Sequence, residues 1–140
     1  MDVAHRLSKT PGRCENIHGH SMWTELQLYG EVNNVGMLQG LDFSLVKKLF
    51  RAHLDSEFDH RTLLYCKDNL ITCVPEIEAP SMRYPGLNTC ADDPTTENLA
   101  KWIGEWAQKT FYEDRDTGIR GIEVKVAETS VNFARWWIEL

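Results

Sequence analysis

Alternation of apolar and polar residues predicts a β-strand that carries two histidines at one end. Side chains two residues apart on a strand point to the same face of the sheet. Between residues 18 and 28 one such face begins with two imidazoles and is mostly apolar beyond them: His18, His20, Met22, Thr24, Leu26 and Leu28. We therefore predict a half-buried strand with a histidine pair near its start.

A second alternating stretch and two amphipathic stretches supply the other predicted elements. Ile122, Val124 and Val126 alternate with polar residues, which indicates another strand. Ser44 is predicted to cap a helix, whose apolar side is Leu45, Val46, Leu49, Phe50 and Leu54. A further helix is predicted to begin within residues 94–97, and its stripe is Leu99, Trp102, Ile103, Trp106, Thr110 and Phe111.

The order of these elements indicates the fold class. Residues 1–7 contain the end of a strand, and residues 65–93 form a long irregular segment with three prolines. Loops of such length are usually functional or mobile. Two strands, a helix, a loop, a helix and two strands predict an α+β fold with an antiparallel sheet. We expect one domain over residues 1–140, with a loop insertion at about 65–93.

Composition and charge limit the classes of function. The chain has 140 residues, 42% of them hydrophobic, which suits one globular domain with a core. Its net charge of -6 argues against nucleic acid as a partner. The sequence shows no apolar run of membrane-spanning length and no secretory leader. We therefore expect a cytoplasmic protein, with no membrane partner, whose cysteines are reduced.

Three histidines near the start of the chain are candidate metal ligands. A strand hairpin would bring His5 beside His18 and His20. Three neutral imidazoles suit Zn²⁺ and leave a fourth position for water or substrate. The alternative is that each histidine is a hydrogen-bonded core residue, but two imidazoles on one strand face favour the metal. Cys66, Cys73 and Cys90 lack C-x-x-C spacing, so we expect free thiols rather than a second metal site.

Two residues before the histidine pair are candidates for proton transfer. Cys14 would lie close to the positive charge of a metal site, which favours the thiolate. The alternative for Cys14 is a small buried hydrophobic residue. Glu15 is either a second catalytic group or an exposed loop acid.

Further along the chain, Asp59 would orient His60 for proton transfer, or the pair is an ordinary feature of a helix end. Glu128 has the strand parity of the apolar residues before it, so its carboxylate would need hydrogen-bond donors, such as two parallel N–H groups of a ligand. Alternatively the strand ends at Ala127 and Glu128 turns outward. Thr95 and Thr96 are most simply helix caps, with Glu97 in the first helical turn.

Taken together, these residues resemble the 6-pyruvoyltetrahydropterin synthase / 6-carboxytetrahydropterin synthase family. The matching pieces, in chain order, are Ala4-His5-Arg6-Leu7, Cys14-x-x-x-His18-Gly19-His20, Asp42-Phe43, Asp59-His60, Pro94-Thr95-Thr96-Glu97-Asn98 and Glu128-Thr129. The resemblance implies a tunnelling fold, which is a four-stranded antiparallel sheet with two helices on one face. It also implies a homo-oligomer, in which trimeric barrels pair into hexamers with active sites between subunits.

The resemblance also implies a role for each candidate residue. Zn²⁺ would be held by His5, His18 and His20, and Cys14 would act as the proton-transfer thiolate. Asp59 and His60 would come from a neighbouring subunit. The pterin ring of the substrate would be anchored by Glu128, and the same pocket would be lined by Thr95, Thr96 and Glu97.

The spacing of the motif favours one reaction within this family. Three residues separate Cys14 from His18, as in the bacterial 6-carboxytetrahydropterin synthases of queuosine biosynthesis. The implied substrate is 7,8-dihydroneopterin triphosphate, and the products are 6-carboxy-5,6,7,8-tetrahydropterin, acetaldehyde and triphosphate. Glu15 stands where a side-chain-cleaving subgroup of the folate branch carries its catalytic Glu, so a lyase that releases 6-hydroxymethyldihydropterin is an alternative. 6-Pyruvoyltetrahydropterin synthase is another.

A metal-binding cupin is an alternative from a different class. Gly12, His18, His20 and Glu25 match the first cupin motif, but no second motif follows. The two predicted helices also disfavour an all-β barrel.

Overall fold

The computed structural model describes residues 1–73 and 92–140. Its strands are β1 (Asp2–His5), β2 (His18–Ser21), β3 (Trp23–Gly30), β4 (Arg61–Leu63), β5 (Ile119–Ala127) and β6 (Phe133–Glu139). Its helices are α1 (Phe43–Glu57), the short α2 (Leu70–Cys73) and α3 (Thr96–Gln108). A 3₁₀ turn covers Arg13–Glu15, and a π-helical turn, Lys109–Glu113, follows α3.

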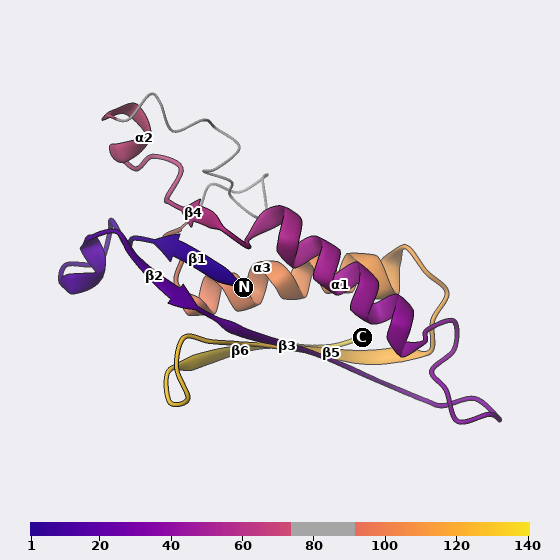
Figure 1. Ribbon diagram of the computed structural model, residues 1–140. Coiled ribbons are helices and arrows are strands. Elements are labelled where there is room, and N and C mark those ends of the chain that lie inside the picture. Colours follow the sequence, from indigo (N-terminus) through magenta and orange to yellow (C-terminus); the bar gives the residue numbers. More distant parts are fainter. Residues whose placement is uncertain (74–91) are drawn as a thin grey trace.

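The strands form two three-stranded sheets in the order β2-β1-β4 and β3-β5-β6. Figure 1 shows α1 and α3 on the same side of the β3-β5-β6 sheet. The α+β class and the two long helices are thereby confirmed. The expected four-stranded, wholly antiparallel sheet is wrong, since β4 pairs with β1 in parallel. A strand of three residues is too short to show an alternating pattern, so neither β4 nor its direction was visible in the sequence.

Hydrophobic burial follows the predicted pattern on β5 and α3. Ile122, Val124 and Val126 are fully buried, as are Leu99 and Ile103 on the facing side of α3. The contact between this helix and the sheet is close. A Cβ atom added at Gly104 would lie 2.0 Å from Cε3 of Trp136 on β6. Only glycine permits this approach, which holds the second half of α3 close against β6.

Side-chain caps fix where both long helices begin. The Asp42 carboxylate accepts a hydrogen bond from the Leu45 backbone N–H at 2.8 Å, so α1 is capped by Asp42. The predicted cap, Ser44, is wrong because it lies inside the first turn. The Thr95 hydroxyl accepts from the Asn98 N–H at 3.2 Å, which confirms Thr95 as the cap of α3.

The expected long loop is partly structured. It contains α2, and Arg6 forms an ion pair with the buried Asp68 at 3.0 Å. Cys14 and Cys73 are free thiols, but Cys66 is disulfide-bonded, so its predicted reduced state is wrong. Sequence spacing cannot show which cysteines meet in a fold. Cys90 and the prolines of this segment lie within residues 74–91, outside the described residues.

In the part of the chain that the structure describes, no helix has the length and apolar character needed to span a membrane.

His53 on α1 makes stability depend on pH. Its ring stacks on Trp106, with centroids 4.1 Å apart, and burial lowers the pKa of His53 from 6.5 to about 4. Between pH 6.5 and about 4 the unfolded chain therefore binds a proton at this site that the folded protein does not, so the free energy of unfolding falls as pH falls.

We expect His53→Phe, which keeps the stacked ring and removes the titration, to lose less stability than the wild-type protein over this interval. Urea unfolding at a series of pH values measures the difference. Parallel stability curves for the two proteins would contradict the assignment.

Candidate metal centre

Pairing of β1 with β2 gathers the three candidate histidines. His5 lies directly opposite His18 in the antiparallel register, and His20 lies two residues further on the same face. Their ring centroids are 4.5, 5.2 and 5.1 Å apart. One nitrogen from each ring lies within 4.8 Å of the other two. Within residues 1–73 and 92–140, this is the one group of at least three His, Cys, Asp or Glu side chains placed to hold a metal ion.

His5 presents an unpaired nitrogen to this group. Its side chain is 1% exposed, and Nδ1 lies 2.8 Å from the Pro94 carbonyl oxygen. A carbonyl only accepts, so Nδ1 carries the proton and Nε2 presents a lone pair. Nε2 is buried without a hydrogen-bond partner. Such an atom costs about 1–3 kcal/mol when left unsatisfied, which a bound metal ion would offset.

The other two histidines complete a ligand set that fits a divalent metal. Nδ1 of His18 lies 2.8 Å from the Asn16 carbonyl oxygen, so its Nε2 also presents a lone pair. Burial, above all, lowers the pKa of His5, and the nearby His18 and His20 add to this effect. The neutral imidazole is the form that binds metal. Metal-ligating histidines commonly donate their second N–H to a backbone carbonyl in this way.

Glu128 bonds to the start of α3 and acts electrostatically on His5. Strand β5 ends at Ala127, as one alternative predicted, but Glu128 does not turn outward. It is half-buried, and its Oε1 accepts a hydrogen bond from the Thr96 hydroxyl at 2.6 Å. Its charge also acts to raise the pKa of His5. Glu128 therefore links the start of α3 to the candidate metal centre.

The three residues that begin α3 lie in different environments. The Thr95 hydroxyl accepts from the Asn98 N–H as the helix cap, whereas the Thr96 hydroxyl donates to Glu128. Glu97 is exposed in the first turn, where an acid stabilises the helix dipole. Thr96 is therefore the member of this trio whose side chain bonds to Glu128.

Cys14 and Glu15 lie together in the 3₁₀ turn Arg13–Glu15. Cys14 is exposed and free, which rules out a buried hydrophobic role. Its carbonyl accepts from the Leu7 N–H at 2.8 Å, and this bond ties the turn to the end of β1. Glu15 is exposed as well. Both side chains are open to a bound small molecule.

Asp59 and His60 form a hydrogen-bonded pair away from the histidine cluster. Nδ1 of His60 lies 2.9 Å from Asp59 Oδ2, and Asp59 Oδ1 accepts from the Asp2 N–H at 2.8 Å. The Asp2 N–H is the largest cause that lowers the pKa of Asp59, and His60 adds to it. Because α1 ends at Glu57, His60 does not cap that helix; it adopts a left-handed backbone conformation with φ of 57°.

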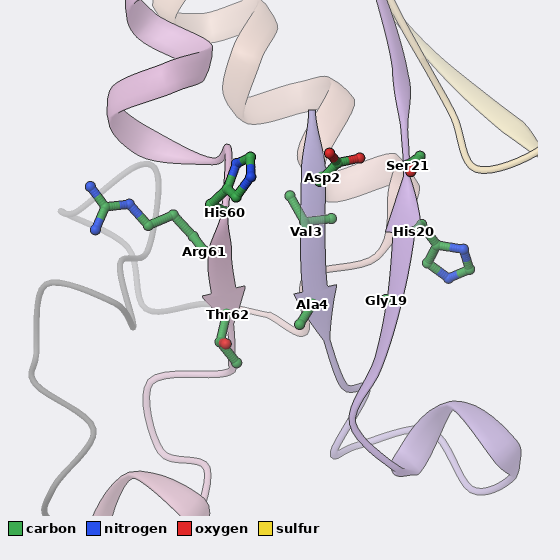
Figure 2. A pocket seen from close by; sticks show the side chains of 9 residues that line it. All are labelled: Asp2, Val3, Ala4, Gly19, His20, Ser21, His60, Arg61 and Thr62. Atoms are coloured by element: carbon green, nitrogen blue, oxygen red, sulfur yellow. The ribbon is translucent and has the colours of Figure 1, made fainter.

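Both His60 and His20 border a shallow hollow of about 430 Å³ across the β2-β1-β4 sheet. Figure 2 shows His60 beside β4 and His20 beyond β2, with β1 between them. His60 donates its N–H to the Asp2 carbonyl at the start of β1, whereas His5 is the last residue of that strand, so within one chain the Asp59–His60 pair lies at the other end of β1 from His5.

The sequence did not indicate which residues outside the histidine cluster orient the His5 ring. The Pro94 carbonyl orients the His5 ring, and the neighbouring Asp93 is buried. Within the motif that begins at Pro94, roles were predicted for Thr95, Thr96 and Glu97 but not for the Pro94 carbonyl. Among the many acidic residues, the sequence gives no sign that Asp93 is the buried one and Asp92 an exposed one.

Comparisons with known proteins agree with this fold and site. The family model for 6-pyruvoyl tetrahydropterin synthase matches residues 1–139. The 6-carboxy-5,6,7,8-tetrahydropterin synthase of Rickettsia bellii is 30% identical over 101 residues, covering 71% of this chain and 69% of that protein. The enzyme of the same name from Synechocystis sp. is 28% identical over 145 residues, covering 98% of this chain and 87% of that protein.

Solved structures share the fold. A catalytic-residue mutant of Plasmodium vivax 6-pyruvoyltetrahydropterin synthase aligns with a TM-score of 0.72 at 18% identity, covering 99% of this chain and 91% of that chain. The Plasmodium falciparum protein of that name aligns with a TM-score of 0.69 at 19% identity, with the same coverage of 99% and 91%. The resemblance inferred from the sequence motifs is thereby confirmed: the chain belongs to the 6-pyruvoyl tetrahydropterin synthase family.

Proposed function

We propose that this protein is a zinc-dependent 6-carboxy-5,6,7,8-tetrahydropterin synthase. Its substrate would be 7,8-dihydroneopterin triphosphate, which with water gives 6-carboxytetrahydropterin, acetaldehyde and triphosphate. The observation that carries the proposal is the buried, unpartnered Nε2 of His5 within a three-histidine cluster. Relatives named for this activity cover most of the chain, which favours it over other reactions of the family.

The metal ligands would be His5, His18 and His20, and three imidazoles suit Zn²⁺ with an open fourth position. Bound there, Zn²⁺ would supply Lewis-acid polarisation of an oxygen on the pterin side chain. The buried His5 and its carbonyl partner keep one ligand in a fixed tautomer, which favours metal binding without rearrangement.

Glu128 would bind the pterin ring. An ionised carboxylate accepts two parallel hydrogen bonds from a planar donor edge, and the N3–H and 2-amino group of a pterin form such an edge. The Thr96 hydroxyl, which donates to Oε1, would hold the carboxylate in one orientation. Thr95 and Glu97 would contribute to the same pocket from the first turn of α3.

Two groups would move protons. The exposed Cys14 thiol would remove a proton from the substrate side chain, and His60, oriented by Asp59, would return one. Since His60 adjoins the start of β1 and His5 ends that strand, the pair would act on substrate held by a neighbouring subunit. This supports the proposed homo-oligomer, a hexamer made of two trimeric barrels.

Exposed aromatic side chains support the same assembly. Trp23 on β3 lies opposite Ala127 on β5, which in turn lies opposite Phe133 on β6, so all three share the outer face of the sheet. Trp137 lies on that face as well, and the three aromatic residues are all strongly exposed. Apolar surface of this kind marks interfaces between proteins.

Queuosine biosynthesis in the cytoplasm is the proposed setting. It rests on the carboxy-synthase reaction, whose product is a small soluble pterin. The disulfide at Cys66 is an observation against a reducing compartment, because disulfides rarely persist there.

Mass spectrometry of products tests the proposal. Zinc-loaded protein incubated with 7,8-dihydroneopterin triphosphate should release 6-carboxytetrahydropterin and acetaldehyde, and protein treated with a chelator should release neither. 6-Hydroxymethyldihydropterin alone would contradict the proposal and assign catalysis to Glu15, which lies beside Cys14 in the same turn. 6-Pyruvoyltetrahydropterin as the only product would identify the pyruvoyl reaction instead. A cupin is ruled out by the family match.

A further inference from the structure

Asp93 is a buried carboxylate that holds the chain just beyond the first metal ligand. It is 4% exposed. Oδ1 accepts from the Ser8 N–H at 3.0 Å and from the Ser8 hydroxyl at 2.9 Å, and Oδ2 accepts from the Lys9 N–H at 2.7 Å. A buried charge is costly unless it is fully hydrogen-bonded. These three donors from two consecutive residues satisfy that requirement and fix Ser8 and Lys9 against Asp93.

The backbone of Asp93 is held from the opposite direction. Its carbonyl accepts from the Thr95 N–H at 2.8 Å and from Nδ2 of Asn98 at 2.8 Å. Asp93 is thus bonded through its side chain to the segment after β1 and through its carbonyl to the first turn of α3. Pro94 lies between these two anchor points, so its carbonyl oxygen has little freedom to move.

The bonds of Asp93 and His5 form one closed ring of contacts. Ser8 follows His5 closely along the chain and donates a hydrogen bond to Asp93. Pro94 follows Asp93, and its carbonyl oxygen lies 2.8 Å from His5 Nδ1, which closes the ring. We propose that Asp93 is a positioning residue for the metal centre. It fixes the Pro94 carbonyl so that His5 keeps its proton on Nδ1 and presents Nε2 to the metal. This inference rests on the proposed metal site.

The same anchor extends to the turn that carries the proposed catalytic thiol. Leu7, next to Ser8, donates its N–H to the Cys14 carbonyl at 2.8 Å. Fixing Ser8 and Lys9 therefore also limits where the Arg13–Glu15 turn lies relative to His5.

The neighbouring Asp92 provides a matched control. Its side chain is 62% exposed, and its Oδ1 lies 3.6 Å from the Lys9 ammonium. Exposed pairs of this kind contribute about 0–1 kcal/mol. Asp92→Asn therefore removes the same charge one residue away without disturbing the buried bonds. Asp93→Asn places an N–H₂ group in the carboxylate's site, so that at least one backbone donor loses its acceptor.

Two measurements on these variants test the proposal. In metal-free protein, ¹H–¹⁵N correlation spectra of the histidine rings should show His5 with its proton on Nδ1 in the wild-type protein and in Asp92→Asn. Asp93→Asn should show a mixture of the two tautomers. Its dissociation constant for Zn²⁺ should rise about 10- to 100-fold, as is typical when support of a metal ligand is lost, while that of Asp92→Asn should stay unchanged.

Each outcome decides the role of Asp93. A folded Asp93→Asn with the wild-type tautomer and Zn²⁺ affinity would overturn it. If that variant does not fold, Ser8→Ala, which removes one of the hydrogen bonds and keeps the carboxylate, should weaken Zn²⁺ binding less strongly, and unchanged affinity would overturn the proposal. If the wild-type protein binds no Zn²⁺, the proposed function fails, and the tautomers of metal-free wild type and Ser8→Ala still decide the role of Asp93.

Discussion

We expect His18→Ala to bind Zn²⁺ about two to three orders of magnitude more weakly than the wild-type protein. A four-ligand structural zinc site is worth about 10–16 kcal/mol, so one ligand accounts for roughly 2.5–4 kcal/mol. His18 is the ligand to change because it is half-exposed on β2, whereas His5 is part of the buried interior. The substitution therefore removes a ligand and leaves the packing intact.

Competition with a chromophoric chelator measures the dissociation constant. His60→Ala is the control, because its ring is 78% exposed and pairs with Asp59 outside the cluster. It should bind Zn²⁺ as the wild-type protein does. Equal affinities for His18→Ala and the wild-type protein would show that the three imidazoles are not the ligands.

The second large effect concerns turnover rather than binding. We expect Cys14→Ala to lower kcat by about 10²- to 10⁴-fold, the usual contribution of one general acid–base group. Its Zn²⁺ affinity should not change, because the histidines hold the metal and the Leu7–Cys14 bond uses only backbone atoms. Steady-state formation of 6-carboxytetrahydropterin, together with the metal affinity, separates these two effects.

Two nearby substitutions sharpen that experiment. Cys73→Ala removes another exposed free thiol, on α2, and should leave kcat unchanged. Glu15→Ala changes the residue next to Cys14 and should spare the carboxy product. Loss of this product in Glu15→Ala with full activity in Cys14→Ala would reverse the two roles and favour the lyase reaction.

Local patterns predicted the parts of the fold that depend on local sequence. Alternation around His18 and along β5, and the apolar stripe of α3, correspond to elements of the structure. A single strand was predicted from residue 18 onward, but the structure breaks it at Met22, between β2 and β3. Met22 is buried, and its N–H bonds to the Met1 carbonyl. The histidine cluster followed from one further assumption, a β1–β2 hairpin, which the register confirms.

Contacts between distant segments could not be predicted. Ser8 and Asp93 are 85 residues apart in the chain, and neither carries a local signal of the other. The same holds for the Pro94 carbonyl that orients His5, for the parallel pairing of β4 with β1, and for the disulfide at Cys66. For Glu128, strand parity indicated an inward carboxylate, but its donor, Thr96, lies on a helix rather than a strand.

Titration of metal-free protein with Zn²⁺, with product formation measured at each addition, is the most direct test of the central claim. The proposed site predicts that formation of 6-carboxytetrahydropterin rises in proportion to added Zn²⁺ and levels off at one equivalent per chain, since the described residues hold one three-histidine cluster. Full activity in the metal-free protein, or no product at any Zn²⁺ concentration, would contradict the account.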